Sequence, residues 1–88
     1  MISGKATVNN RVGLHLAAAS AVVEASMRFK ARITVAKDRK KRNARSVLDL
    51  LMLEAVTGTE LTIEADGEDE KEALAALLDV FARNFGEK

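Results

Sequence analysis

Two residue periodicities alternate along the 88 residues of this chain. Apolar residues at every second position predict half-buried strands at residues 2–8, 32–36 and 60–65. Small and apolar residues at helical spacing predict helices at residues 16–27, at residues 47–53 and from Asp69 to Phe85. A chain that alternates in this way over so short a length is restricted to one small domain, residues 1–88.

A fourth, shorter strand is predicted at Lys40–Asn43, after a tight turn at residues 37–39. Its charged side chains would discourage edge-to-edge pairing with another molecule. The element order β-α-β-β-α-β-α, joined by short loops, predicts an α+β domain of two layers, with helices on one face of a sheet and water on the other. The outward-facing strand residues are Lys5, Thr7, Arg32, Thr34, Thr62 and Glu64.

The composition excludes several classes of chemistry. The absence of Cys excludes a disulfide scaffold and a thiol nucleophile, and a single His excludes multi-histidine metal sites, so no metal or cofactor is expected. The first five residues lack the apolar core of a signal peptide, and no apolar run approaches the ~20 residues that span a bilayer. These features predict a soluble cytoplasmic protein without membrane insertion.

His15 is the residue with the clearest chemical potential. It follows a loop containing Gly13 and precedes the first predicted helix, where the first backbone N–H groups have no partner inside the helix. Such a helix start favours anions, and a neutral imidazole nitrogen is a competent nucleophile toward phosphorus. These features make His15 a candidate to carry a phosphoryl group, held by the N–H groups of Leu16 and Ala17. From its position alone, a surface or capping histidine without chemistry is the favoured interpretation.

The chain resembles the HPr family, the histidine phosphocarriers of the phosphoenolpyruvate-dependent sugar phosphotransferase system of bacteria. The resemblance covers essentially the whole chain and rests on residues 13–15, 43–46, 58–63 and 66–67. It implies an open-faced sandwich, with a four-stranded antiparallel sheet and three helices on one side. It also implies that His15 takes a phosphoryl group from enzyme I and passes it to enzyme II components.

The site differs from the family's usual Gly-[Leu/Ile]-His-Ala-Arg-Pro-Ala pattern, because Leu16, Ala17 and Ala18 stand where Ala, Arg and Pro are expected. The missing Arg matters most, since a guanidinium neutralises phosphate through paired donors. Losing one charge-assisted partner costs about 1.5–3 kcal/mol, which is a ten- to hundred-fold effect if it is fully expressed in transfer. Arg11 and Arg45 are predicted to substitute for it.

The resemblance implies a regulatory role for Ser46, the position that a dedicated kinase phosphorylates in some bacteria. Ser46 also precedes the helix at residues 47–53 and is predicted to cap it, with Asp49 as the acidic member of a capping box. The family usually has Gly at position 49, and a carboxylate there would repel a phosphate on Ser46. A plain capping role is therefore favoured over modification by a serine kinase. Asp69 or a neighbour is predicted to cap the last helix.

Leu48 and Leu51 occupy the positions of the family's exposed apolar docking patch. Packing in the core is the alternative for both, and it is favoured for Leu50 and Leu53. The implied partners are enzyme I and enzyme II-type proteins. The protein is expected to bind them as a monomer.

Charge is divided unevenly along the chain. Residues 1–45 hold eleven basic and two acidic side chains, whereas residues 46–88 hold three and eleven. The densest run, residues 37–45, has six cations in nine residues. It is interpreted as a solvated edge strand, as a rim near His15 and Ser46 that steers acidic partners, or as a nucleic-acid patch. The run contains no aromatic residue for base stacking, which argues against nucleic acid, and the basic half is expected to be the docking side.

Three hypotheses follow. The first is a phosphocarrier with a covalent intermediate on His15, rather than a stand-alone catalyst. The second is an HPr-like regulatory docking module with weak or no phosphotransfer, which Ala17 favours. The third and weakest is a small nucleic-acid-binding domain that uses residues 37–45.

Overall fold

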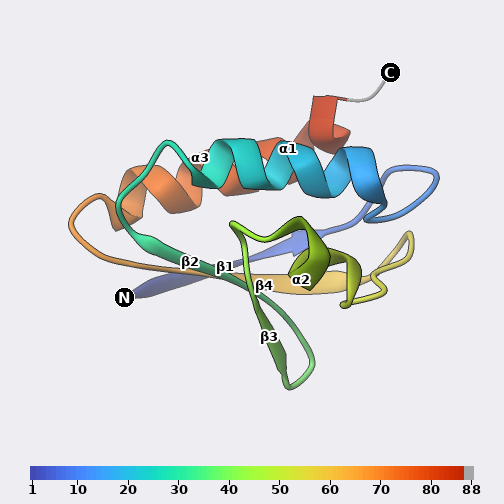
Figure 1. Cartoon of the computed structure of the whole chain (residues 1–88), viewed down its shortest axis with the longest axis horizontal. Helices are drawn as coiled ribbons and strands as arrows, with labels where there is room; N and C mark the ends of the chain where they lie inside the picture. Colours follow the sequence, from blue (N-terminus) through green and yellow to red (C-terminus); the bar gives the residue numbers. More distant parts are fainter. Residues whose placement is uncertain (87–88) are drawn as a thin grey trace.

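The computed structural model describes residues 1–86. The strands within this range are β1 (Ile2–Thr7), β2 (Arg32–Lys37), β3 (Lys40–Asn43) and β4 (Glu60–Asp66). The α-helices are α1 (Leu16–Ser26), α2 (Val47–Leu51) and α3 (Glu70–Ala82), followed by the short 3₁₀ turn η1 (Asn84–Gly86) (Figure 1). These bounds differ from the predicted ones by a few residues at the element ends.

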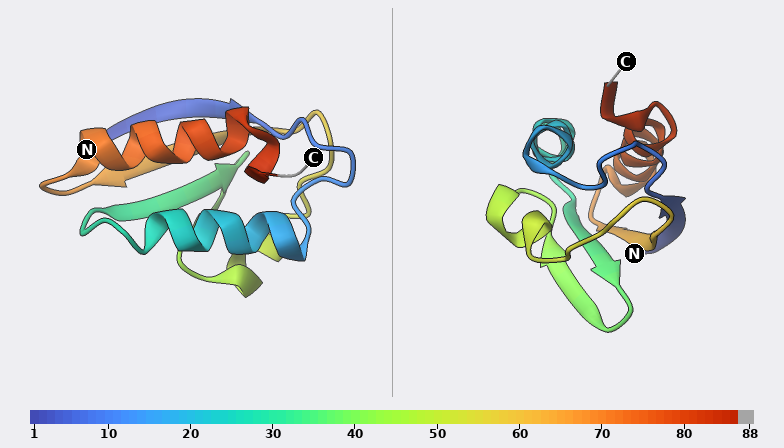
Figure 2. Two further views of the ribbon diagram at one scale, coloured as in Figure 1. Left: turned by 90° about the horizontal axis from the view of Figure 1, so that it is seen from above. Right: turned by 90° about the vertical axis from the view of Figure 1, so that its right-hand side faces the viewer.

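The four strands form one antiparallel sheet in the order β1-β4-β2-β3. Helices α1 and α3 run side by side over one face of this sheet, and α2 packs beside α1 and β3 (Figures 1 and 2). The opposite face carries the polar side chains of alternate strand residues and is open to water. The predicted open-faced α+β sandwich is confirmed.

The acidic strand β4 lies between the basic strands β1 and β2. Lys5 on β1 pairs with Glu60 on β4 at 3.4 Å, Lys41 on β3 reaches across β2 to Glu64 on β4 at 3.4 Å, and the N-terminal ammonium lies 3.5 Å from Asp66. The uneven charge of the sequence is therefore interleaved when the chain folds. The basic and acidic halves of the sequence therefore do not form two separate charged faces, and the expectation that the basic half is the docking side stays a prediction.

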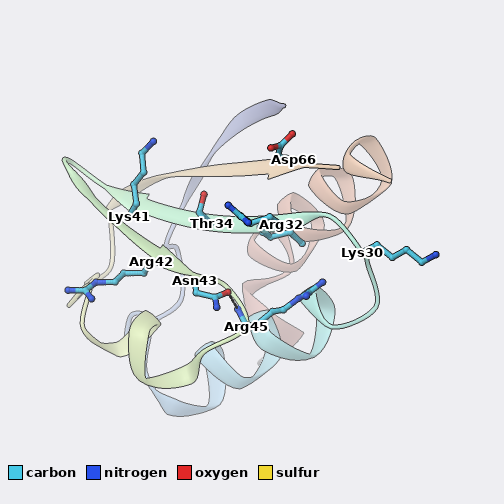
Figure 3. A pocket seen from close by; sticks show the side chains of 9 residues that line it. Lys30, Arg32, Thr34, Lys41, Arg42, Asn43, Arg45 and Asp66 are labelled. Atoms are coloured by element: carbon cyan, nitrogen blue, oxygen red, sulfur yellow. Dashed lines mark hydrogen bonds between the residues drawn. The ribbon is translucent and has the colours of Figure 1, made fainter. Parts of the chain in front are cut away.

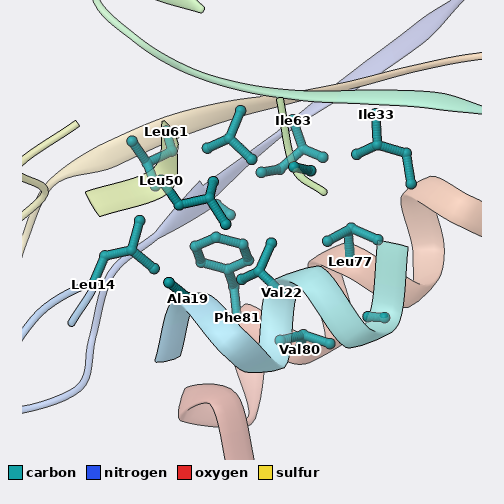
Figure 4. Packing of buried hydrophobic residues seen from close by; sticks show 14 of the residues in the cluster. Leu14, Ala19, Val22, Ile33, Leu50, Leu61, Ile63, Leu77, Val80 and Phe81 are labelled. Atoms are coloured by element: carbon teal, nitrogen blue, oxygen red, sulfur yellow. The ribbon is translucent and has the colours of Figure 1, made fainter. Parts of the chain in front are cut away.

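The core lies between α1, α3 and the inner face of the sheet, with Leu50 and Leu53 closing one side (Figure 4). Side chains from the helices and from the sheet are fully buried there, including Val22, Ile33, Leu61, Ile63 and Leu77.

The helix predicted from Asp69 to Phe85 ends earlier, at Ala82. The buried residues of this helix are Ala73, Leu77, Val80 and Phe81, while Leu74 and Leu78 only border the core. Phe85 is buried, but it lies in η1 after the helix has ended, with a φ of 61°. The chain turns sharply there, so that the rings of Phe81 and Phe85 meet edge to face at 4.9 Å.

The capping predictions hold only in part. The Ser46 hydroxyl accepts from the Asp49 N–H at 3.2 Å and caps α2 as predicted. The Asp49 carboxylate accepts from the Asn43 N–H at 3.2 Å instead of closing a capping box, because the Ser46 N–H already donates to the Asn43 carbonyl. Asp69 precedes α3 without capping it through its side chain.

Candidate functional site

The loop that presents His15 is held in place by its own polar groups. The buried side chain of Asn10 donates through Nδ2 to the Gly13 carbonyl at 2.7 Å, and that same carbonyl accepts from the His15 N–H at 2.9 Å. The Leu14 N–H donates to the Ala55 carbonyl at 2.8 Å. Gly13 has a φ of 84°, and a Cβ there would lie only 2.8 Å from the Ala55 oxygen. A rigid loop therefore delivers the chain to the start of α1.

His15 is the N-cap of α1. Its backbone is extended, with φ −91° and ψ −173°, and its carbonyl accepts the first helical bond from the Ala19 N–H at 2.8 Å. The ring nitrogen Nδ1 accepts from the Ala17 N–H at 3.2 Å. Because Nδ1 accepts, it carries a lone pair, and the proton of the neutral ring is on Nε2. The nucleophilic nitrogen of the only histidine is thus directed at the first turn of a helix.

The first turn of α1 combines exposed and buried residues. Ala17 is exposed, and the Leu16 side chain is 62% exposed, while Ala18 and Ala19 are buried beneath them. Leu16, the first residue of the helical spacing, therefore lies at the exposed edge of the site and not in the core. The N–H groups of Leu16 and Ala17 belong to the turn that Nδ1 faces, so a charged group on Nδ1 would lie against donors and the positive end of the helix dipole.

Of the two arginines predicted to replace the missing guanidinium, only Arg11 lies in the loop next to His15. Arg11 is exposed in the loop before His15, and its carbonyl accepts from the Thr57 hydroxyl at 3.2 Å. The Arg45 guanidinium instead donates to the carbonyls of Phe29 and Ala31, beyond the C-terminal end of α1. An 11-residue helix is ~16 Å long, so Arg45 lies far from His15. The prediction that Arg45 serves the phosphate site is wrong.

Ser46 is half-buried at the start of α2, and its hydroxyl oxygen is engaged by the Asp49 N–H. The Asp49 carboxylate is in turn fixed by the Asn43 N–H. A phosphate on Ser46 would have to share this first turn with a fixed negative charge, which opposes it. This geometry fits a structural cap.

Exposed apolar side chains gather near His15 and along α2. We call this set the apolar rim, and it consists of Val12, Leu16, Leu48, Met52 and Val56. The loop before α1 and the segment after α2 lie at the same end of the molecule (Figures 1 and 2), and the Gly13 backbone contacts Val56.

The structure divides the predicted docking pair and adds residues that the sequence reading missed. Leu48 is 68% exposed, whereas Leu51 is partly buried against the core. Leu50 and Leu53 are fully buried, as favoured. Val12, Met52 and Val56 were not anticipated, although Val12 and Val56 are apolar residues isolated within predicted loops, which is a usable signal.

The basic run does not form one patch. Lys37 donates to the carbonyls of Leu53 and Glu54 at 3.1 and 3.3 Å, and Lys41 pairs with Glu64. With Arg45 turned to the far end of α1, a cationic rim around His15 is not formed by this run. Within residues 1–86, no group of His, Cys, Asp and Glu is placed to hold a metal ion, and no helix is long and apolar enough to cross a membrane.

The fold and this site define a class of protein, a small open-faced α+β sandwich whose one histidine caps its first helix. Residues 2–83 match the family model PTS-HPr, described as the PTS HPr component phosphorylation site. The chain belongs to the HPr family of the phosphotransferase system.

Individual relatives are similar over nearly their whole length. Phosphocarrier protein HPr of Neisseria meningitidis serogroup B is 36% identical over 87 residues, 99% of this chain and 98% of that protein. HPr-like protein Crh of Bacillus subtilis is 42% identical over 77 residues, 88% of this chain and 91% of that protein. The crystal structure of HPr-C-His from Thermoanaerobacter tengcongensis superposes with a TM-score of 0.94 at 35% identity, covering 100% of this chain and 99% of that one.

Proposed function

We propose that this protein is a phosphocarrier in which His15 accepts a phosphoryl group from enzyme I and passes it to an enzyme II-type acceptor. One observation carries the proposal. In a chain of the HPr family, the Nδ1 lone pair of His15 is held against the first turn of α1 by the Ala17 N–H. A nucleophile and the donors that would hold its product are therefore adjacent before any partner arrives.

In the transfer step the Nδ1 lone pair attacks phosphorus. A new N–P bond forms as the bond between phosphorus and the donor group breaks, and the donor atom keeps the bonding pair. The proton stays on Nε2, so the ring carries a positive charge beside the phosphoryl group. The Ala17 N–H then loses Nδ1 as its acceptor and turns to a phosphoryl oxygen, next to the Leu16 N–H. Transfer to the acceptor is the same step in reverse.

The remaining donors only partly replace the family's arginine. Ala18 supplies an N–H that the usual Pro lacks, and Arg11 is the cation available from the same loop. A neutral N–H contributes less to a phosphate than a paired guanidinium does. We therefore expect transfer to be slower than in relatives that keep the arginine.

The apolar rim is proposed as the docking surface for both partners, because its side chains are exposed and two of them, Val12 and Leu16, lie close to His15 in the chain. We infer a single domain over residues 1–88 that works as a monomer in the bacterial cytoplasm, in sugar transport or its regulation. The alternative is a dimer, as in the crystal structure of an HPr dimer from T. tengcongensis and the swapped dimer of Crh. Sedimentation velocity over a range of concentrations tests the oligomeric state.

A second function, regulatory docking with weak or no transfer, is supported by Ala17 and by the similarity to Crh. One experiment separates the two. The wild type, His15→Ala and Ser46→Ala are incubated with enzyme I and phosphoenolpyruvate, and acid-labile phosphate is measured by intact mass spectrometry.

Label on the wild type and on Ser46→Ala, but not on His15→Ala, supports the phosphocarrier. Label that survives His15→Ala rejects it. An unlabelled wild type that still binds enzyme I supports the regulatory module.

A further inference from the structure

A hollow of about 680 Å³ opens beside β2 and β3, near the loop that joins α1 to β2 (Figure 3). Its lining is cationic. The charged side chains that line it are Lys30, Arg32, Lys41, Arg42, Arg45 and Asp66. These residues come from several separate segments, so the fold itself concentrates the positive charge at this place.

The two carboxylates nearest the hollow already have partners. Glu64 pairs with Lys41 at 3.4 Å, and Asp66 lies 3.5 Å from the N-terminal ammonium. Within residues 1–86, no carboxylate lies within ion-pair distance of Lys30, Arg32 or Arg45. Arg32 stands opposite Asp66 in the β2–β4 register and still forms no ion pair with it. Arg32 and Arg45 therefore line the hollow without an acidic partner, whereas Lys30, at its edge, lies near the Asp69 carboxylate, which accepts from its backbone N–H.

Arg45 is fixed toward this region by the backbone. Its guanidinium donates to the carbonyls of Phe29 and Ala31, and its N–H donates to Oδ1 of Asn43 at 2.9 Å. Asn43 also lines the hollow, and with Oδ1 engaged it offers its amide N–H groups. Because the Arg45 guanidinium and the Asn43 amide are already held in place, they lose little conformational entropy when an anion binds.

The lining favours one ligand chemistry. Guanidinium groups match the geometry of phosphate oxygens, and two arginines without an acidic partner call for more than one negative charge. The lining has no aromatic side chain on which a base could stack. Glu64 and Asp66 limit the positive region to a short stretch, so an extended polyanion lying along the sheet would meet negative charge.

We propose that this hollow binds a compact compound with two or more linked or closely spaced phosphates. Free oligophosphates and small phosphorylated metabolites share this chemistry. The site lies beyond the C-terminal end of α1, whereas His15 caps the N-terminal end of that helix. Binding at the hollow is therefore independent of phosphotransfer at His15.

The test is calorimetric titration with inorganic tripolyphosphate at physiological ionic strength, together with backbone amide NMR shifts. Arg32→Gln removes an exposed cation of the hollow, and Arg39→Gln removes an exposed cation of the β2–β3 turn outside it. We expect one saturable site with shifts centred on Thr34, Asn43 and Arg45. Arg32→Gln should weaken binding about tenfold or more, equivalent to about 1.4 kcal/mol, and Arg39→Gln less than about twofold.

A second variant, Lys30→Gln, checks the result at another position of the hollow, and His15→Ala should bind like the wild type. A sugar bisphosphate such as ribose 1,5-bisphosphate, compared with inorganic pyrophosphate, distinguishes a phosphorylated metabolite from a free oligophosphate. Three results would each overturn the proposal. They are equal weakening by Arg32→Gln and Arg39→Gln, NMR shifts confined to the first turn of α1, and tighter binding of duplex DNA than of tripolyphosphate. Absence of saturable binding would do the same, whatever the outcome at His15.

Discussion

At the scale of single residues, the donor set around His15 is what separates this chain from the usual family pattern. Nδ1 faces the Ala17 N–H, so a side chain at position 17 starts beside the nitrogen that reacts. Ala17 is exposed, which leaves room for a longer side chain.

Ala17→Arg should therefore raise the rate of phosphotransfer from enzyme I. A charge-assisted partner of the phosphoryl group contributes about 1.5–3 kcal/mol, which corresponds to a gain of about ten- to hundred-fold. Initial rates of acid-labile labelling measure the effect. Ala75→Arg, at an exposed position of α3, is the matched control and should change the rate little. An equal gain in both variants would show that net charge, rather than position, is responsible.

Gly13 and Gly58 test how far the rigid loop depends on close packing. Both have a positive φ, 84° and 92°, but a Cβ at position 13 would lie 2.8 Å from a carbonyl oxygen, whereas nothing lies within 4 Å at position 58. Gly58→Ala should cost about 1–2 kcal/mol of unfolding free energy from backbone strain alone. Gly13→Ala should cost more and should also slow labelling of His15. Denaturant unfolding of both variants measures the difference, and equal costs would contradict the contact.

At the scale of elements, much of the fold could be predicted from the sequence because each strand and helix carries its own periodicity. His15 was identifiable because a loop glycine and a helix start are local signals. The contacts of Arg45, Asp49 and Asp69 were not predicted correctly, because their partners lie outside the helix turn next to each residue. Arg45 reaches carbonyls 14 and 16 residues away, and Asp69 reaches N–H groups nearly 40 residues away. Periodicity carries no information on such contacts.

Helix α2 contains one leucine that packs in the core and one that is exposed. Leu50 is fully buried, and Leu48 is 68% exposed. Leu50→Ala should lower the unfolding free energy by about 2–5 kcal/mol through a cavity, whereas Leu48→Ala should lower it by less than about 0.5 kcal/mol. Leu48→Ala should weaken binding to enzyme I, as measured by calorimetry. Unchanged binding would remove Leu48 from the docking surface.

At the scale of the whole molecule, Asp69 joins the start of α3 to the loop between α1 and β2. Its carboxylate accepts from the N–H groups of Lys30 and Ala31 at 2.9 and 2.8 Å, and the Lys30 N–H is the main cause that lowers the pKa of Asp69 below its usual 3.8. Because the folded pKa is lowered, this contribution to stability is complete above the usual pKa. It is lost as the pH falls from there through the folded value.

Asp69→Asn should therefore lower the Tm at neutral pH, and the difference from the wild type should shrink on acidification below pH 3.8. Thermal unfolding followed by circular dichroism across this range measures it. Glu68→Gln removes the same charge at an exposed neighbouring position and should show a smaller change. A difference between Asp69→Asn and the wild type that stays constant with pH would contradict the role of the ionised carboxylate.

The central position of β4 also governs how the molecule is made. β1 pairs only with β4, and β2 reaches β1 only through it, so the sheet has a gap until residues 60–66 have been synthesised. The first half of the chain then leaves the ribosome able to form only the β2–β3 pair, with β1 unpaired and its apolar faces uncovered. Such non-local pairing slows folding and favours a single cooperative step late in synthesis. The nascent chain is consequently most exposed to aggregation and to proteases just before its fourth strand emerges.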